Sequence, residues 1–239
     1  MEISSRGQSM IFNQYNENLK SLILFGSHSR GYNTIDSDID LLGIDDKQKF
    51  TVRNIGKVNF SFYSTDKSLE MCRQGDLFFL HIVSEGKCLF NDHFFNELRN
   101  SFRFKESYLS EAAVAYYLAQ KIIKNSSDIS NWIIANKRIS WCVRTILIAL
   151  SAEQRNPIYS KTELSTKLIE IGFENNSTML LIDAKKFNTK NNEILSFLSY
   201  FLNKYKFLEK ELNKKNFYSD GIVHSTLDAI LNSTPSHYE

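Results

Sequence analysis

Residues 22–44 read LILFGSHSRGYNTIDSDIDLLGI and contain the pattern that decides the fold. The first four residues form an apolar run of strand length that ends at the pair Gly26-Ser27. Ten residues separate this pair from a second strand, which is predicted over Asp38 to Ile44. Because a strand, a glycine turn and another strand follow one another, the pattern favours a mixed layout of strands and helices.

The same stretch carries residue types that suit phosphate chemistry. Gly26 has no side chain, so a phosphate can approach its backbone. Ser27 offers a hydroxyl and an amide at the start of a short helical turn, which is a natural site for an anion. Asp38 and Asp40 are two residues apart on the predicted strand, so both carboxylates project from one face. Paired carboxylates are hard oxygen ligands that suit Mg²⁺, and the pattern therefore predicts a metal site beside a phosphate-binding turn.

This segment resembles the signature of the DNA polymerase β-like nucleotidyltransferases. That signature is Gly-Ser, then about ten residues, then Asp-x-Asp flanked by apolar residues, with strands on both sides. The segment is particularly similar to the minimal nucleotidyltransferases of bacteria, which often show Arg-Gly after the serine and Ser-Asp-Ile-Asp-Leu at the strand. Arg30-Gly31 and Ser37 to Leu41 match those two features.

The resemblance implies an enzyme that transfers a nucleoside monophosphate from an NTP, with ATP as the expected donor, to a hydroxyl group and releases pyrophosphate. Mg²⁺ or Mn²⁺ would be the cofactor. The residues it implies are Asp38 and Asp40 for catalysis and metal binding, and Gly26, Ser27 and Arg30 for nucleotide binding. Arg30 can equally be interpreted as a surface residue of the turn, and the sequence leaves both interpretations open.

The third carboxylate that such proteins usually carry on the next strand has no obvious counterpart. Residues 57–64 (KVNFSFYS) alternate with period two, which directs Phe60 and Phe62 to one side and Asn59 to the other. Asn59 therefore occupies the position of the third acid, and a neutral amide cannot offset the charge of a metal. The site works with two aspartates, or a nearby acid such as Asp66 substitutes, or activity is degenerate. Weakened or specialised catalysis is the favoured interpretation.

Three classes of acceptor stay open. A protein acceptor is implied by the resemblance to antitoxin-type minimal nucleotidyltransferases. A small-molecule acceptor would match the aminoglycoside adenylyltransferases, and a nucleic-acid or nucleotide acceptor would fit a toxin–antitoxin or phage-defence setting. A different alternative is a nucleotide-binding module that has lost turnover and acts through a protein partner. A homodimer is among the assemblies that the sequence leaves open.

The periodicity of the chain changes near residues 100–106, and this predicts two domains in an α+β protein. Residues 1–104 are expected to form a small mixed-sheet nucleotidyltransferase domain, and residues 105–239 an all-α helical bundle that resembles, in architecture only, the one in kanamycin nucleotidyltransferase-like proteins. Further elements expected in the first part are a helix over 10–20, a strand over 57–64, helices over 68–74 and 76–84 and a strand over 87–90. Those expected in the second are helices over 110–124, 129–152, 161–171 and 192–212.

Composition excludes several classes of protein. Among the 239 residues, 42% are hydrophobic and 23% charged, which is typical of a globular chain. Cys72, Cys88 and Cys142 are odd in number and far apart, so neither a disulfide framework nor a metal cluster is expected. No apolar run approaches the ~18 residues of a membrane span, and a cytoplasmic protein without a membrane partner is expected. A net charge of +2 does not by itself predict a nucleic-acid partner.

A few other polar residues are weaker candidates. His81 lies in the apolar helical run FFLHIV and is interpreted as a core histidine with a partner for its ring. In the helical part, four cations could include one that reaches the NTP phosphates, although the solvated-surface interpretation is favoured for each: Lys137, Arg138, Arg144 and Lys161.

Overall fold

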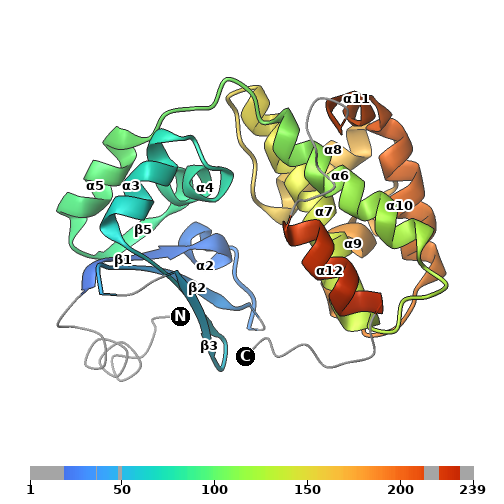
Figure 1. The fold of residues 1–239 in the computed structure, drawn as a ribbon, viewed down its shortest axis with the longest axis horizontal. Coiled ribbons are helices and arrows are strands. Elements are labelled where there is room, and N and C mark those ends of the chain that lie inside the picture. Colours follow the sequence, from blue (N-terminus) through green and yellow to red (C-terminus); the bar gives the residue numbers. More distant parts are fainter. Residues whose placement is uncertain (1–18, 36, 48–49, 213–220, 232–239) are drawn as a thin grey trace. The chain divides into compact units, whose positions relative to one another are not determined.

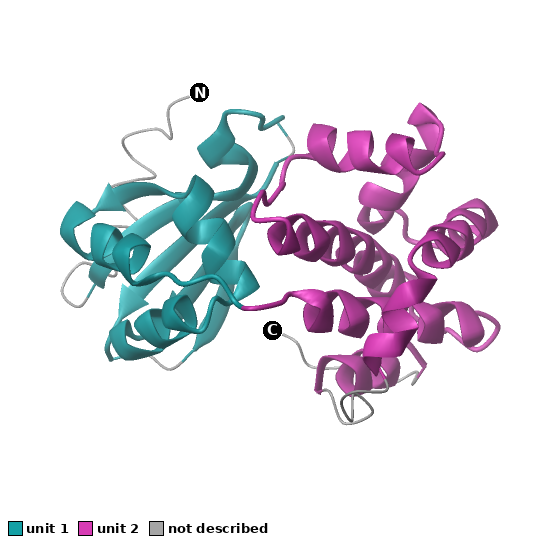
Figure 2. Cartoon of the chain, turned by 90° about the horizontal axis from the view of Figure 1, so that it is seen from above, with its two compact units in different colours: residues 1–105 teal, residues 106–239 magenta. Residues whose placement is uncertain are grey.

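A computed structural model describes residues 19–35, 37–47, 50–212 and 221–231. The chain divides into two compact units, residues 1–105 and 106–239, which Figure 2 colours separately. The first unit combines a five-stranded sheet with helices, and the second is helical throughout its described part. The expected α+β class is therefore confirmed.

The sheet of the first unit has the strand order β3-β4-β2-β1-β5. Strands β2 and β4 run parallel, whereas the pairs β1–β2, β1–β5 and β3–β4 are antiparallel. The elements of this unit are β1 (Leu19–Phe25), α2 (Gly26–Arg30), β2 (Ile39–Asp45), β3 (Thr51–Ile55), β4 (Val58–Tyr63), α3 (Thr65–Arg73), α4 (Leu77–Glu85), β5 (Lys87–Phe90) and α5 (Asp92–Ser101).

The two faces of the sheet carry separate apolar clusters, because alternate residues of a strand point to opposite faces. On one face, residues such as Ile23, Phe25 and Leu42 pack with side chains of α3, α4 and α5, and Figure 1 shows these three helices together on one side of the sheet. On the other face, Phe60 and Phe62 lie among Leu22, Leu24 and Leu41 of the neighbouring strands. The residues of β4 that point away from the two phenylalanines therefore face the helices.

Several expectations for this unit need correction. The helix expected over 10–20 falls outside the described residues as far as residue 18, and Leu19 and Lys20 belong to β1 instead. β2 begins at Ile39, one residue later than expected. β3 and α5 were not anticipated. β3 is an edge strand with mostly exposed side chains, so it shows little of the alternation that marks a half-buried strand.

The starts of α3 and α4 are set by side-chain caps. Ser64 accepts a hydrogen bond from the backbone N–H of Lys67, so α3 begins before the expected residue 68. Asp76 accepts from the backbone N–H groups of Phe78 and Phe79, and is therefore the cap of α4 and not its first residue. Both helices are otherwise close to the expected ranges.

The second unit contains more helical segments than the sequence patterns predicted. The segments not anticipated are α9, the short 3₁₀ turn η1 and α12, each of which is short. The elements are α6 (Leu109–Lys124), α7 (Trp132–Glu153), α8 (Lys161–Glu170), α9 (Asn175–Ile182), η1 (Ala184–Lys186), α10 (Asn192–Lys204), η2 (Lys206–Leu208), α11 (Glu209–Leu212) and α12 (Gly221–Leu231).

The expected helix over 192–212 is broken. It ends at Lys204, and the 3₁₀ turn η2 connects it to the short α11. Leu208 on η2 is fully buried, and Glu209 accepts hydrogen bonds from Tyr116 Oη and Gln120 Nε2 of α6, both at 3.0 Å. The tertiary contacts of these two residues favour the tighter turn over a continuous helix.

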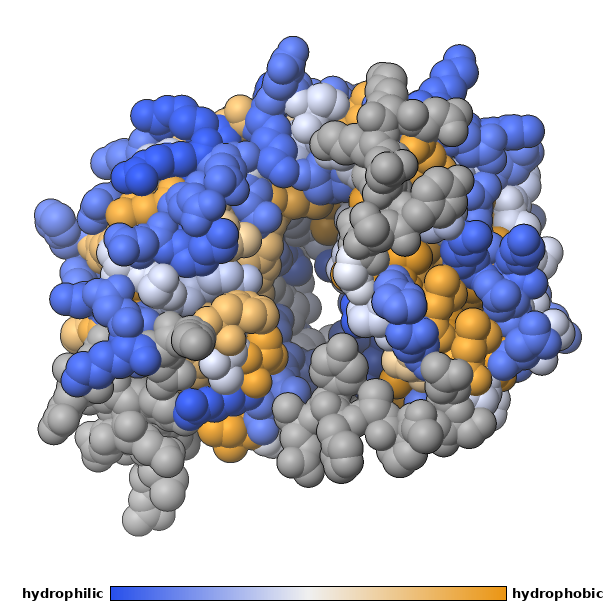
Figure 3. Space-filling view, in the orientation of Figure 1, coloured by the Kyte–Doolittle hydropathy of each residue, from blue (hydrophilic) through white to orange (hydrophobic). Residues whose placement is uncertain are grey.

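The surface mixes polar and apolar side chains. On the face drawn in Figure 3, small hydrophobic patches lie between hydrophilic side chains. Within the described ranges, no helix combines the length and the apolar character that crossing a membrane requires.

All three cysteines are free. Burial, with a smaller effect of Asp76, raises the pKa of the Cys72 thiol to about 12, so it is not a reactive thiolate near neutral pH.

Candidate functional site

The turn between β1 and β2 begins with a left-handed backbone conformation. β1 ends at Phe25, and Gly26 opens the single-turn helix α2 with a φ of +74°. α2 closes at Gly31, which adopts the left-handed conformation (φ 76°) and donates its backbone N–H to the carbonyl of His28. Ser27, half-buried, follows Gly26 directly. Glycine is favoured at both ends because other residues pay about 1–2 kcal/mol for positive φ.

Asp40 lies directly against this turn. It is the second residue of β2 and pairs with Phe25 across the antiparallel β1–β2 ladder. A Cβ atom on Gly26 would be only 2.6 Å from Asp40 Oδ2. The sequence had suggested that Gly26 makes room for a phosphate. The structure supplies a second reason, because the carboxylate of Asp40 occupies the space that a side chain would need.

Asn59 lies on the other side of Asp40. The two residues are direct neighbours in the parallel β2–β4 pair, and Asn59 Nδ2 donates to Asp40 Oδ1 at 3.1 Å. The alternation along residues 57–64 predicted this position for Asn59, and the burial of Phe60 and Phe62 on the opposite face agrees with it. Asp40 therefore has a neutral amide beside it, at the position that the family resemblance assigns to a third acid.

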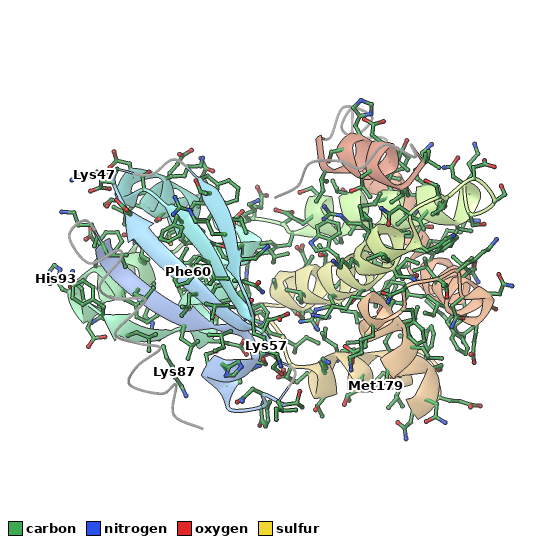
Figure 4. All side chains as sticks on the ribbon, turned by 90° about the horizontal axis from the view of Figure 1, so that it is seen from below. Lys47, Lys57, Phe60, Lys87, His93 and Met179 are labelled. Carbon is green, nitrogen blue, oxygen red and sulfur yellow. The ribbon has the colours of Figure 1, made fainter. Side chains whose placement is uncertain are left out.

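Asp38 is an exposed residue immediately before β2. The segment leading to it is tied to α2 and to the β3–β4 turn. His28 Nε2 lies 3.3 Å from the carbonyl oxygen of Ser37, and Lys57 Nζ donates to the carbonyl of Ile35 at 2.8 Å. Figure 4 labels Lys57 at this end of the sheet and Phe60 within the sheet. These contacts connect the chain before Asp38 with the turn that holds Ser27.

Among the residues that the structure describes, no third carboxylate joins the pair. Asp66 lies in the first turn of α3, after the opposite end of β4. From Asn59 to the end of that strand at Tyr63 the chain advances about 13 Å at ~3.3 Å per residue. Within the described ranges, no three His, Cys, Asp or Glu side chains gather where they could hold a metal ion. The site thus offers two carboxylates and one amide.

Arg30, the last residue of α2, contacts α4. Its Nη1 atom forms an ion pair with Glu85 Oε2, and the same oxygen lies 2.9 Å from His81 Nε2. His81 thus has a polar partner for its ring, as the sequence suggested. Glu85 was not recognised as a site residue. The available signal was two ionisable residues four positions apart in an otherwise apolar helix, which places both on one face.

Two of the four cations considered in the helical part have partners within their own unit. Lys161 forms a salt bridge with Asp183 at 2.7 Å, and Arg144 Nη2 donates to the carbonyl of Tyr159 at 3.3 Å. Lys137 is exposed and Arg138 is half-buried, both on α7. Their role toward a nucleotide stays a prediction.

Comparisons with known proteins agree with this geometry. Residues 8–64 match the family model of the nucleotidyltransferase domain. The crystal structure of spectinomycin adenyltransferase AAD(9) from Enterococcus faecialis, with ATP and spectinomycin, is similar in fold, with a TM-score of 0.50 and 12% identity over 82% of this chain and 95% of that one. A nucleotidyltransferase-like protein from Exiguobacterium sibiricum aligns at 14% identity over 88% of this chain and 80% of that one. Its TM-score of 0.33 is too low for a comparison of folds.

A search of curated protein sequences finds no match to this chain. The family match covers β1, the Gly-Ser turn, Asp38, Asp40 and β4, which are the elements that build the site. Residues 8–64 of the N-terminal unit therefore match a nucleotidyltransferase domain, and the fold of the chain is similar to that of the adenyltransferase.

Proposed function

We propose that this protein transfers a nucleoside monophosphate from an NTP, with ATP as the preferred donor, to a hydroxyl group of an acceptor. The contact between Asp40 and the Gly-Ser turn is the observation that carries the proposal. Asp40 Oδ2 lies 2.6 Å from the position that a Cβ of Gly26 would take, so the acid of the Asp-x-Asp pair and the Gly-Ser turn are close enough to act as one site. A nucleotidyltransferase needs both within reach of the same triphosphate.

The residues present fit a divalent cation. Asp38 and Asp40 supply carboxylate oxygens, which are the ligands that Mg²⁺ and Mn²⁺ accept together with water and substrate phosphates. Asp40 Oδ1 already accepts one hydrogen bond from Asn59, and a carboxylate oxygen retains a further lone pair for a metal. A bound cation would supply charge neutralisation at the triphosphate and would lower the pKa of the attacking hydroxyl.

In the proposed reaction, the residues of the turn hold the leaving group. An acceptor oxygen forms a bond to the α-phosphorus while the bond from that phosphorus to the bridging oxygen of the β-phosphate breaks, and pyrophosphate leaves. The acceptor proton passes to solvent. In the proposal, the backbone at Gly26 and the hydroxyl of Ser27 hold the β- and γ-phosphates, which keeps the leaving group in line with the attack.

A small hydroxylated molecule is the first acceptor to test. The adenyltransferase of similar fold was crystallised with ATP and spectinomycin, and the likeness extends over most of both chains. Protein hydroxyl groups and nucleotides follow as the second and third classes. The cytoplasmic location and the homodimer considered from the sequence stay predictions.

A second candidate function is nucleotide binding without turnover. The hydrogen bond from Asn59 to Asp40 favours it, since an amide in place of an acid adds no negative charge to a metal site. A protein of this kind would act through a partner that senses the bound NTP. Release of pyrophosphate separates the two functions.

The decisive experiment is incubation of the protein with each labelled NTP and Mg²⁺ or Mn²⁺, in the presence of the three acceptor classes in turn. Wild-type protein is expected to release pyrophosphate and to move the label to one class. Asp40→Asn should abolish release, whereas Asp66→Asn, a control acid at the far end of β4, should retain it. Tight NTP binding without any release would favour the binding module. Full activity in Asp40→Asn would contradict the proposed site.

A further inference from the structure

We propose that Glu85 is a positioning residue for NTP binding: with His81, it holds Arg30 and thereby fixes the α2 turn that presents Ser27 to the phosphates. The inference rests on the proposed function, because it assigns the phosphates to this turn. It gives Arg30 an indirect role in place of a direct contact with the triphosphate.

The turn needs such a tether because its own structure is weak. α2 has five residues and no side-chain cap at its first residue, and a helix this short is not stable by itself. Locally, Ser29 Oγ donates to the carbonyl of Gly26 at 2.8 Å. The ion pair between Arg30 and Glu85, which are 55 residues apart in the sequence, connects the turn to α4, a helix that packs on β1.

His81 and Glu85 together contact both ends of the turn. Arg30 is the last residue of α2, whereas Phe25 is the residue before its first. The ring of Phe25 meets the ring of His81 edge-on, with centroids 5.8 Å apart. Since His81 and Glu85 are four residues apart on α4, one face of that helix holds the entry and the exit of the turn.

The ion pair between Arg30 and Glu85 is largely shielded from water. The side chains of Arg30 and Glu85 are only 14% and 19% exposed, so their attraction is screened less than that of a surface pair. Loss of one partner leaves a charge that water reaches poorly. The carboxylate also lies within hydrogen-bonding distance of His81. Glu85 thus orders two other side chains, and a neutral residue there should loosen the end of α2.

The expected consequence is weaker binding of NTP with little change in the chemical step. Ser27 would hold the β- and γ-phosphates both before and during the reaction, so disorder of the turn removes binding common to both states. Such a loss raises KM and leaves kcat unchanged. A general loss of folded protein would instead lower the apparent kcat and leave KM where it was.

The test compares Glu85→Gln with Glu70→Gln in the full chain. The glutamine at 85 keeps the size and one acceptor oxygen but loses the charge. Glu70 is the matched control, because it forms an ion pair with Lys67 on α3 at 3.1 Å with both side chains 50% exposed. Equilibrium binding of ATP with Mg²⁺, binding of adenosine and hydrogen exchange of the backbone amides over residues 26–32 are measured for each.

For Glu85→Gln we expect ATP affinity to fall on the order of tenfold, adenosine binding to stay unchanged and the amides of the turn to exchange faster. Glu85→Asp should recover part of the ATP affinity, and Glu70→Gln should match wild type. Equal ATP affinity in the two glutamine variants would overturn the inference, as would a lowered melting temperature with an unchanged dissociation constant.

The measurements also separate this inference from the proposed function. Wild-type protein that binds ATP but releases no pyrophosphate with any acceptor would contradict transfer, while the ratio of dissociation constants would still decide the role of Glu85. Wild-type protein that binds none of the four NTPs would overturn both.

Discussion

The side-chain amide of Asn59 donates a hydrogen bond to Oδ1 of Asp40 across the parallel β2–β4 pair. Because Gly26 adjoins the other oxygen of the same carboxylate, Asp40 lies between the Gly-Ser turn and a neutral neighbour. The site therefore has a fixed acid at its centre and lacks the charge of a third one.

Asn59→Asp should convert this hydrogen bond into a repulsion between two carboxylates. Without metal, the free energy of unfolding should fall by about 1–3 kcal/mol, since a hydrogen bond is lost and like charges face each other. Mg²⁺ or Mn²⁺ should raise the melting temperature of the variant more than that of wild type. Asn54→Asp, one strand further from Asp40, is the control. A metal response equal to that of wild type would mean that residue 59 does not face the metal site.

Gly26→Ala should be more damaging than its backbone strain alone explains. Alanine at positive φ costs about 1–2 kcal/mol. Its Cβ would in addition lie only 2.6 Å from Asp40 Oδ2, so the carboxylate would have to move. Gly56→Ala is the matched variant, because φ is +60° there and no atom lies within 4 Å of the new Cβ. Circular dichroism in urea and pyrophosphate release are measured for both. Activity should be lost only in Gly26→Ala, and equal losses in the two variants would refute the steric argument.

Ser27→Ala should weaken NTP binding and leave binding of the bare nucleoside unchanged. Loss of one hydrogen bond to a charged group costs about 1.5–3 kcal/mol, or roughly one to two decades in affinity. Ser29→Ala provides the contrast, because its buried hydroxyl donates to the carbonyl of Gly26 and should affect stability first. If the nucleoside and the triphosphate lose affinity equally, Ser27 does not contact phosphate.

The helical unit should be sensitive to acid through Asp183. Burial raises the pKa of this carboxyl, but the ammonium groups of Lys161 and Lys186 outweigh burial and hold the pKa below its usual value. A carboxyl whose pKa is lower in the folded state stabilises the fold at pH values above its unfolded-state pKa of about 4. This stabilisation is lost as the pH falls through the folded-state pKa. Asp183→Asn should therefore be less stable at neutral pH and lose less stability below about pH 4.

Tryptophan fluorescence can follow this unit selectively, since the only two tryptophans, Trp132 and Trp141, both lie on α7. Glu170→Gln removes an exposed pair with Lys167 and should change stability little. Identical pH profiles for wild type and Asp183→Asn would show that the lysines do not stabilise the folded carboxylate.

Local patterns predicted much of the sheet. The apolar run before Gly26, the Asp-x-Asp strand and the strand over 87–90 are recognisable because each is short, apolar and bounded by turn residues. Alternation over 57–64 also put Asn59 on the face opposite Phe60 and Phe62. The edge strand β3 escaped prediction because its side chains are mostly exposed. α5 was missed although Asn91 and Asp92 stand directly before its first apolar residues, which is a usual signal for the beginning of a helix.

The sequence by itself therefore indicated which residues are candidates for phosphate and metal chemistry, since residue type and spacing along one strand–turn–strand segment are local properties. Only the tertiary structure decided their neighbours: that Asn59 bonds Asp40, that Asp40 requires a glycine at 26, and that Glu85 holds Arg30. The physical reason is that these contacts join different elements, so they depend on strand order, on the registers of β1, β2 and β4 and on the packing of α2 against α4. Side chains up to 55 residues apart meet through that arrangement, and local periodicity does not encode it.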